Sequence, residues 1–120
     1  MSFRIGAEVD KKYYLTHIGK DLICWGIPDG KNLAATGSLC LFNRVPYQEN
    51  LTGKEGYLFN IYTCSAFRKR GFATEIIKEI IRYAAEMQIK RLWLNSSEHG
   101  RQLYARCGFV AKNNEMEHSL

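Results

Sequence analysis

The sequence predicts an α+β fold, in which a mixed, mostly antiparallel sheet is flanked by helices. The first observation is a pair of apolar runs, Leu22–Ile27 and Leu33–Phe42, joined by a Pro-Asp-Gly turn, which predicts an antiparallel hairpin. The second is a strand–helix–strand order in which Gly56–Thr63 and Arg91–Asn95 flank a long amphipathic segment. Since strands connected through a helix pair in parallel, at least one pair of this sheet is expected to be parallel.

The first third of the chain supplies a short helix and the hairpin. Apolar and aromatic side chains recur at helical spacing in Asp10–Ile18, which predicts a short helix there. Gly37 lies inside the second strand of the hairpin and predicts a bulge or a close approach of another backbone. Asn43–Glu55 contains proline, asparagine and glycine and is expected to be a loop.

The middle of the chain carries the strongest periodic signals. Gly56–Thr63 is aromatic, β-branched and nearly continuous in hydrophobicity, which is typical of a strand buried on both faces. Phe72–Gln88 is predicted to be a helix, because its apolar residues form one stripe at helical period and its charged residues occupy the opposite side. The stripe consists of Ala73, Ile76, Ile77, Ile80, Ile81, Ala84 and Met87.

The last elements are a second helix and a final pair of strands. Ser96 or Ser97 is expected to cap a helix over about Glu98–Arg106 by accepting from its free main-chain N–H groups. Gly108 would end that helix in a left-handed conformation. Phe109–Ala111 and Glu115–His118 predict two short strands around a turn-prone asparagine pair.

Composition limits the class of protein. The 120 residues allow one domain with its own core but not two. The formal net charge of +5 favours anionic partners such as nucleic acid, phosphorylated cofactors or acidic lipid, without choosing among them. The simpler explanation of the charge is a mildly basic surface.

The cysteines and histidines are scattered. The four cysteines form no C-x-x-C pair and, like the three histidines, show no metal-ligand spacing, so we expect reduced thiols and no metal site. Met1–Asp10 has no apolar run of the kind found in signal peptides, and no stretch approaches the ~20 apolar residues of a membrane span. We therefore expect a cytoplasmic protein with no membrane partner.

A basic, glycine-containing turn precedes the long helix. It consists of Arg68, Lys69, Arg70, Gly71, Phe72 and Ala73. The main-chain N–H groups of a first helical turn have no intrahelical partner and, with the helix dipole, favour bound anions. Gly71 would let a phosphate approach the backbone, so the turn suits a diphosphate, although a solvated basic run before a helix is the simpler alternative. The patterns of P-loops and of dinucleotide-binding folds are both absent.

This turn and the segments after it resemble a known family. Arg68-x-x-Gly71-x-Ala73, after an apolar strand and before an amphipathic helix, is similar to the Q/R-x-x-G-x-G/A signature of the GNAT superfamily of N-acetyltransferases. The resemblance continues through Ile89–Asn95, Gly100–Tyr104 and Cys107-Gly108-Phe109, and it covers the chain from about Leu22 onward. It implies a GNAT-like sheet with a central parallel strand pair that splays apart to form a cleft for acetyl-CoA.

The resemblance also implies the roles of individual residues. The pantetheine arm would pair with the main chain of Ile61, Tyr62 and Thr63, and the pyrophosphate would bind the turn from Arg68 to Ala73. A main-chain N–H near Ile61 or Tyr62 would stabilise the oxyanion during direct transfer to an amine, a contribution typically of ~3 kcal/mol. Tyr104 would protonate the departing thiolate, its alternative role being to pack the second helix on the sheet.

Two further site residues are open to alternatives. Asn95 would hydrogen-bond the pantetheine arm, or it merely ends its strand. Glu55 and Glu49 precede the third strand and could act as the general base directly or through water, although the simpler interpretation is that both are solvated loop charges. An amine that is already neutral would need no base.

The N-terminal region departs from the family pattern. Relatives carry a first strand and two helices before the position of Leu22, whereas Met1–Asp21 has room for about one helix. We expect a single domain over residues 1–120 with a reduced N-terminal helical region over residues 1–21. Either the acceptor site is unusually open or a second subunit covers it, which predicts a homodimer.

Three functions therefore compete. An N-acetyltransferase for a small-molecule or peptidyl amine, with acetyl-CoA as co-substrate and no metal, fits the largest number of features. A non-catalytic CoA-binding module would keep the basic turn without a complete acceptor site. A nucleic-acid-binding domain would use the cations of the turn, but Phe67 and Phe72 have the pattern of core residues, so we expect no nucleic-acid partner.

Overall fold

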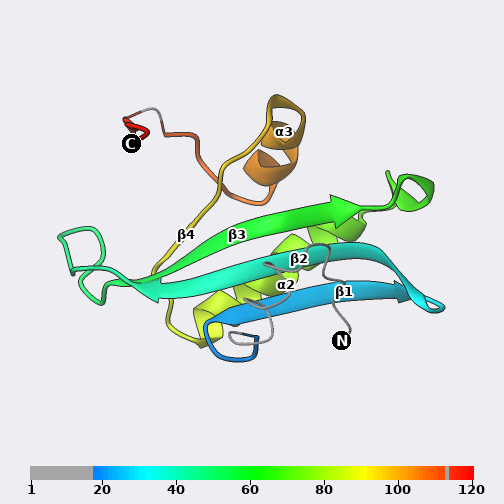
Figure 1. Ribbon diagram of the computed structural model, residues 1–120, viewed down its shortest axis with the longest axis horizontal. Coiled ribbons are helices and arrows are strands. Elements are labelled where there is room, and N and C mark those ends of the chain that lie inside the picture. The colour runs from blue at the N-terminus through cyan, green and yellow to red at the C-terminus, as the bar shows by residue number, and fades with distance from the viewer. Residues whose placement is uncertain (1–17, 113) are drawn as a thin grey trace.

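The computed structural model describes residues 18–112 and 114–120. Their elements are β1 (Leu22–Asp29), β2 (Asn32–Asn43), β3 (Lys54–Thr63), η1 (Ser65–Phe67), α2 (Phe72–Glu86), β4 (Arg91–Trp93) and α3 (Glu98–Arg106). The strands form one sheet in the order β1-β2-β3-β4 (Figure 1). The first two pairings are antiparallel and the β3–β4 pairing is parallel, so the predicted mixed sheet is confirmed. The predicted helix over Asp10–Ile18 and most of the reduced N-terminal region lie outside the described residues.

The β1–β2 hairpin forms as its turn chemistry predicts. Gly30 follows Asp29 with φ of +61°, a conformation that glycine adopts without steric cost. The ladder runs from Asp29 opposite Asn32 to Leu22 opposite Cys40. Loop residues 44–53 then connect β2 to β3, close to the range expected from the sequence.

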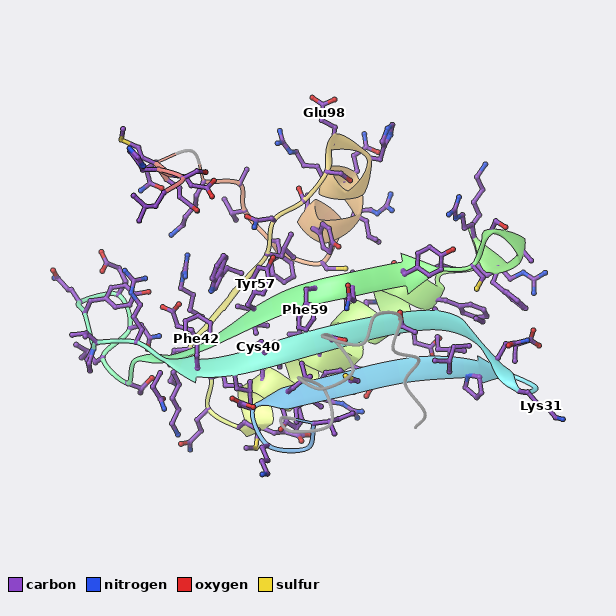
Figure 2. All side chains as sticks on the ribbon, in the orientation of Figure 1. Lys31, Cys40, Phe42, Tyr57, Phe59 and Glu98 are labelled. Carbon is purple, nitrogen blue, oxygen red and sulfur yellow. The ribbon has the colours of Figure 1, made fainter. Side chains whose placement is uncertain are left out.

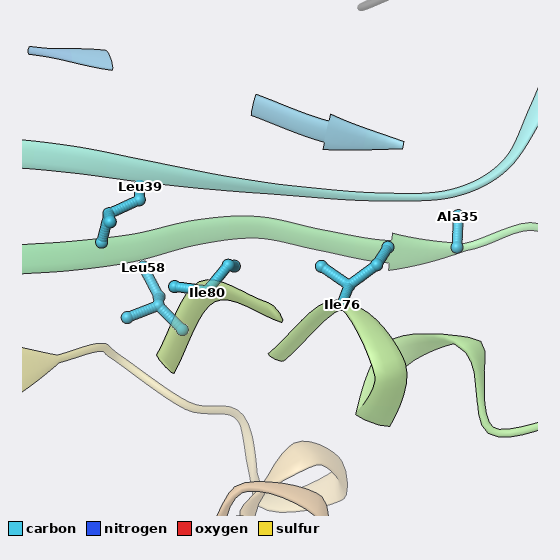
Figure 3. Close-up of a cluster of buried hydrophobic side chains, with 5 residues drawn as sticks. All are labelled: Ala35, Leu39, Leu58, Ile76 and Ile80. Atoms are coloured by element: carbon cyan, nitrogen blue, oxygen red, sulfur yellow. The ribbon is translucent and has the colours of Figure 1, made fainter. Parts of the chain in front are cut away.

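Helix α2 covers one face of the sheet, behind the strands in the view of Figure 1. The centre of the core on that face consists of Ala35, Leu39, Leu58, Ile76 and Ile80 (Figure 3). The predicted helical stripe is buried at Ile76, Ile77, Ile80 and Ala84. Met87 was expected in the stripe but is 49% exposed, because α2 ends at Glu86 and Met87 lies past its last turn.

Strand β3 is only partly the doubly buried strand that its hydrophobicity predicts. Gly56 and Leu58 are buried, whereas Asn60 and Tyr62 near its end are exposed. The change occurs where Asn60 adopts φ of +53°, outside the normal range of a strand. The prediction of burial on both faces is therefore wrong for the second half of the strand.

A β-bulge separates the two halves of β3. Ser38 pairs with Phe59 and Thr36 with Tyr62, so two residues of β3, Asn60 and Ile61, face the single residue Gly37 of β2. The irregularity that Gly37 predicts is thus confirmed, with the extra residue on the neighbouring strand. A bulge bends its strand and displaces one residue from the regular ladder.

The parallel pair is short and its strands then part. Glu55, Gly56 and Tyr57 pair with β4, which ends at Trp93, two residues earlier than expected. Strand β3 continues to Thr63 without that neighbour, while the chain leaves the sheet toward α3 (Figure 1). Helix α3 is capped as predicted, because the Ser97 side chain accepts from the Gly100 N–H at 3.3 Å.

The C-terminal segment differs from the prediction. Gly108 has the expected positive φ, but residues 109–112 and 114–120 form no strand. Val110 and Met116 are 83% and 96% exposed, so the two short segments bury little apolar surface. A two-stranded hairpin without a packed face is marginally stable at best, which explains why Phe109–Ala111 and Glu115–His118 are not paired.

Candidate active site

A pocket of about 440 Å³ opens beside the second half of β3, where that strand no longer has β4 as a neighbour. Its walls come from β3, from the segment after β4, from α3 and from the start of α2. The lining residues are Tyr57, Leu58, Phe59, Asn60, Ile61, Ala73, Asn95, Ser96, Ser97, Gly100, Leu103 and Tyr104. Segments far apart in the sequence therefore meet around one cavity.

Four of the residues predicted for the site line this pocket. They are Ile61, Ala73, Asn95 and Tyr104. The others do not line it: Tyr62, Thr63, Arg68, Lys69, Arg70, Gly71 and Phe72. Tyr62 pairs with Thr36 directly after the bulge, and the residue is 55% exposed.

The turn before α2 is open to solvent. Gly71 caps the helix with φ of +79°, and a Cβ placed there would meet nothing within 4 Å. The first helical hydrogen bond runs from the Glu75 N–H to the Gly71 carbonyl at 3.0 Å. The main-chain N–H groups of Phe72, Ala73 and Thr74, in the first turn of α2, therefore have no partner within the helix. These donors and the helix dipole make the turn suited to an anion.

The cations of this turn have different surroundings. Arg68 Nε donates to the Thr63 carbonyl at 3.3 Å and so fastens the turn to the end of β3. The Arg70 guanidinium lies 5.2 Å from the centroid of the Phe67 ring, which in turn stacks on Phe72. All three cations are exposed, so the local positive potential faces solvent.

Tyr104 is held in place by the residues around it. Its ring meets Phe109 edge to face with centroids 6.0 Å apart. Burial raises the pKa of Tyr104 above its ordinary value of 10.0, and the neighbouring Cys107 adds to this effect. The phenol therefore keeps its proton at neutral pH and can donate it.

The aromatic part of the pocket was missed by reasoning from sequence. Tyr57 and Phe59 project from the face of β3 opposite α2 (Figure 2) and stack with centroids 5.9 Å apart. The Tyr57 ring also lies 4.6 Å from that of Trp93, and Asn95 Nδ2 approaches the Tyr57 hydroxyl at 3.5 Å. The period-two spacing of the two aromatic residues was the available signal.

Glu55 is not a solvated loop charge, and that expectation is wrong. It is 2% exposed and accepts hydrogen bonds from Arg91 and from the Tyr47 hydroxyl, both at 2.9 Å. Arg44 lies 3.5 Å from its second oxygen. Burial alone would raise the pKa of Glu55, but the hydrogen bonds and the positive charges outweigh it and lower the pKa.

Among the residues that the structure describes, no carboxylate lines the pocket. Glu55 lies at the start of β3, and Glu49 is exposed in the loop before that strand. A group with a lowered pKa that is already bonded by two partners is also a poor proton acceptor.

Among the described residues, no cluster of three or more histidine, cysteine or acidic side chains could hold a metal ion. No helix of residues 18–112 and 114–120 is long and apolar enough to cross a bilayer.

Comparison with known proteins gives a consistent result. Residues 3–109 match the model of the acetyltransferase (GNAT) family. Over 84 residues the chain is 30% identical to the probable glucosamine 6-phosphate N-acetyltransferase 2 of Oryza sativa subsp. japonica. That alignment covers 70% of this chain and 49% of the rice protein, so the chain spans about half the length of this relative.

Solved structures share the fold. A predicted acetyltransferase from Clostridium acetobutylicum, crystallised with acetyl-CoA, superposes with a TM-score of 0.86 at 26% identity. The match covers 98% of this chain and 79% of that one. The glucosamine-6-phosphate N-acetyltransferase of Arabidopsis thaliana gives a TM-score of 0.75 at 20% identity, over 91% of this chain and 73% of its own, which is a likeness of fold alone.

Proposed function

Because this chain belongs to the acetyltransferase (GNAT) family, we propose that it transfers an acetyl group from acetyl-CoA to a primary amine. The amine would attack directly, with both substrates bound at once. The observation that carries the proposal is the single pocket that joins the β3 bulge, Tyr104 and the open first turn of α2. A thioester placed in it would have a diphosphate-binding turn at one end and a proton donor beside the reacting sulfur.

The donor end of the proposal rests on the turn from Arg68 to Ala73. The N–H groups in the first turn of α2 would offer donors to the two phosphates, and the open face of Gly71 leaves room for a phosphate against the backbone. Lys69 and Arg70 add charge from the solvent side. Asn95, which lines the pocket, would hydrogen-bond an amide of the pantetheine arm.

The chemical step needs an oxyanion donor and a proton donor. As the amine nitrogen bonds to the thioester carbonyl carbon, negative charge develops on the carbonyl oxygen, and a main-chain N–H at Ile61 or Tyr62 would stabilise it. When the tetrahedral intermediate collapses, the carbon–sulfur bond breaks and the thiolate leaves. Tyr104 would give that thiolate its phenolic proton. The amine nitrogen, positively charged after its attack, would lose its extra proton to water, and solvent would reprotonate the tyrosinate. Its raised pKa favours the protonated form that this role requires.

The acceptor is proposed to react as the neutral amine. This route needs no side-chain base, and the described residues that line the pocket include no carboxylate. An amine with a pKa near ~10 is only slightly deprotonated at neutral pH, and that fraction would be the reactive one. The named substrate of the rice relatives, glucosamine 6-phosphate, is itself an amine and is the first acceptor to test.

A thiol-release assay tests this function. Acetyl-CoA and the full chain are mixed with a panel of amines that includes glucosamine 6-phosphate, amino acids and a lysine peptide, and free CoA thiol is followed with time. Steady, acceptor-dependent release together with acetylated product in the mass spectrum would support the transferase. Binding of CoA in calorimetry without release for any amine would instead support the non-catalytic CoA-binding module. A chain that neither binds CoA nor releases its thiol would refute both functions.

A further inference from the structure

We infer that Gly37 is a positioning residue for the donor site, because it sets the distance between the β3 bulge and the first turn of α2. The inference rests on the proposed binding of CoA across these two features. Gly37 lies on β2, on the face covered by α2 and directly opposite the bulge. It touches neither the pocket nor the basic turn itself.

The space around Gly37 is closed on the helix side. A Cβ built on it would lie 2.4 Å from Cγ2 of Ile76 and 3.0 Å from Cδ1 of Ile61. The first distance is about 1 Å shorter than an ordinary carbon–carbon contact of about 3.5 Å. Only glycine therefore allows α2 to pack this closely against the sheet at this point.

Ile76 cannot easily rotate away. It is β-branched and lies in a helix, where one χ1 rotamer is strongly preferred, and its Cγ2 is fixed directly to Cβ. It is also buried, 3% exposed, and projects from α2 toward the sheet (Figure 3). A methyl group at position 37 would therefore displace the helix backbone rather than one flexible side-chain end.

That displacement would reach both halves of the donor site. Ala73 lies one helical turn before Ile76 on the same side of α2, and it lines the pocket. Ile61 is a bulge residue and lines the pocket from the opposite wall. A side chain at position 37 would thus press on Ile61 directly and on Ala73 through the helix that carries Ile76. The separation of Ile61 and Ala73 decides whether one CoA molecule can bind the bulge and the turn together. A misplacement of about 1 Å in a positioned site can cost about a hundredfold in reaction rate, and we expect a loss of CoA affinity within that limit.

The matched control is Gly56, a second glycine of the same sheet. A Cβ there would lie 2.8 Å from Cδ1 of Leu39 and 2.9 Å from Cδ2 of Leu92. Both are ends of leucine side chains, and Gly56 lies in the β3–β4 pairing before the bulge. Gly56→Ala therefore overpacks the sheet without moving the first turn of α2.

Calorimetric binding to CoA and to its nucleotide fragment, 3′-phospho-ADP, tests the inference. CoA needs both halves of the site, whereas the fragment needs only the turn. We expect Gly37→Ala to weaken CoA binding between about tenfold and a hundredfold and to change fragment binding less than twofold. Gly56→Ala should leave both affinities within twofold. Equal losses for CoA and the fragment, or no loss of CoA affinity in Gly37→Ala, would overturn it. A wild-type chain that binds no CoA would instead refute the proposed function.

A second pair of variants keeps the test open if Gly37→Ala does not fold. Ile76→Ala removes the side chain that the new methyl group would meet, so Gly37→Ala should be tolerated in that background. The double variant and Ile76→Ala alone are then expected to bind CoA equally, within twofold. A tenfold difference between them would show that contact with Ile76 is not the reason for the glycine.

Discussion

Replacing Gly71 by valine tests the phosphate-binding turn most directly. Gly71 has φ of +79°, and a Cβ placed there meets no described atom within 4 Å. The variant would instead strain the backbone and place a branched side chain over the free N–H groups of the turn. We expect the fold to persist and CoA binding to be lost.

Gly30 supplies a matched control for the strain. It also has a positive φ, +61°, and open space at its Cβ, but it lies in the β1–β2 turn. A left-handed non-glycine residue costs about 1–2 kcal/mol, so Gly71→Val and Gly30→Val should both lower the melting temperature of the free protein by about 4–8 °C. Only Gly71→Val should affect the ligand.

Thermal melts with and without CoA measure the difference. At a hundredfold excess over Kd, CoA should stabilise the wild type by about 2.7 kcal/mol, or about 11 °C for a domain of this size. Gly30→Val should keep that shift and Gly71→Val should lose it. A Gly71→Val variant that melts cooperatively and still gains about 11 °C from CoA would show that the diphosphate does not bind at the start of α2.

The remaining predictions concern the proton donor, the buried glutamate and the acceptor. Tyr104→Phe keeps the ring contact with Phe109 but lacks the phenolic proton, so kcat should fall about a hundredfold while the KM for acetyl-CoA changes less than twofold. A change in KM with an unaltered kcat would contradict the acid role. The lowered pKa of Glu55 means that its stabilising contribution is present above its unfolded pKa of 4.5 and is lost as the pH falls through the lower folded value. Melting temperatures between pH 7 and 3 should therefore drop less for Glu55→Gln than for the wild type, starting from a lower value at pH 7. Because the neutral amine reacts, kcat/KM for the acceptor should rise about tenfold per pH unit below the pKa of the amine. Glu49→Gln should leave that profile unchanged, and a flattened profile would reveal a base in the loop.

Local chemistry made most of the fold predictable. The Pro-Asp-Gly turn defines the β1–β2 hairpin, Ser97 marks the start of α3, and Gly108 follows its end. Each of these signals depends on a few adjacent residues, whose preferences the rest of the fold does not override. The glycine before α2 was also readable, since the positive φ of Gly71 follows from a local preference of glycine.

The features that sequence reasoning missed depend on distant partners. Glu55 is buried because Arg91, 36 residues away in the sequence, meets it across the parallel pair. The break in β3 at Asn60 is visible as a polar residue within an apolar run, but its position becomes clear only opposite Gly37. The two strands predicted near the C-terminus, Phe109–Ala111 and Glu115–His118, do not form. Their local pattern lacks a packed face, and a pair of short strands is not stable without one.

The early parting of β3 and β4 has a consequence for how this protein can evolve. Mutations that extended the pairing beyond Tyr57 and Trp93 would add main-chain hydrogen bonds and raise thermal stability. The same mutations would continue the β3–β4 pairing across the place where a thioester is proposed to bind, and so close that site. Selection for thermal stability should therefore favour a longer β3–β4 pairing, and selection for catalytic turnover a shorter one. Variants with a longer β4 are expected to be more stable and less active.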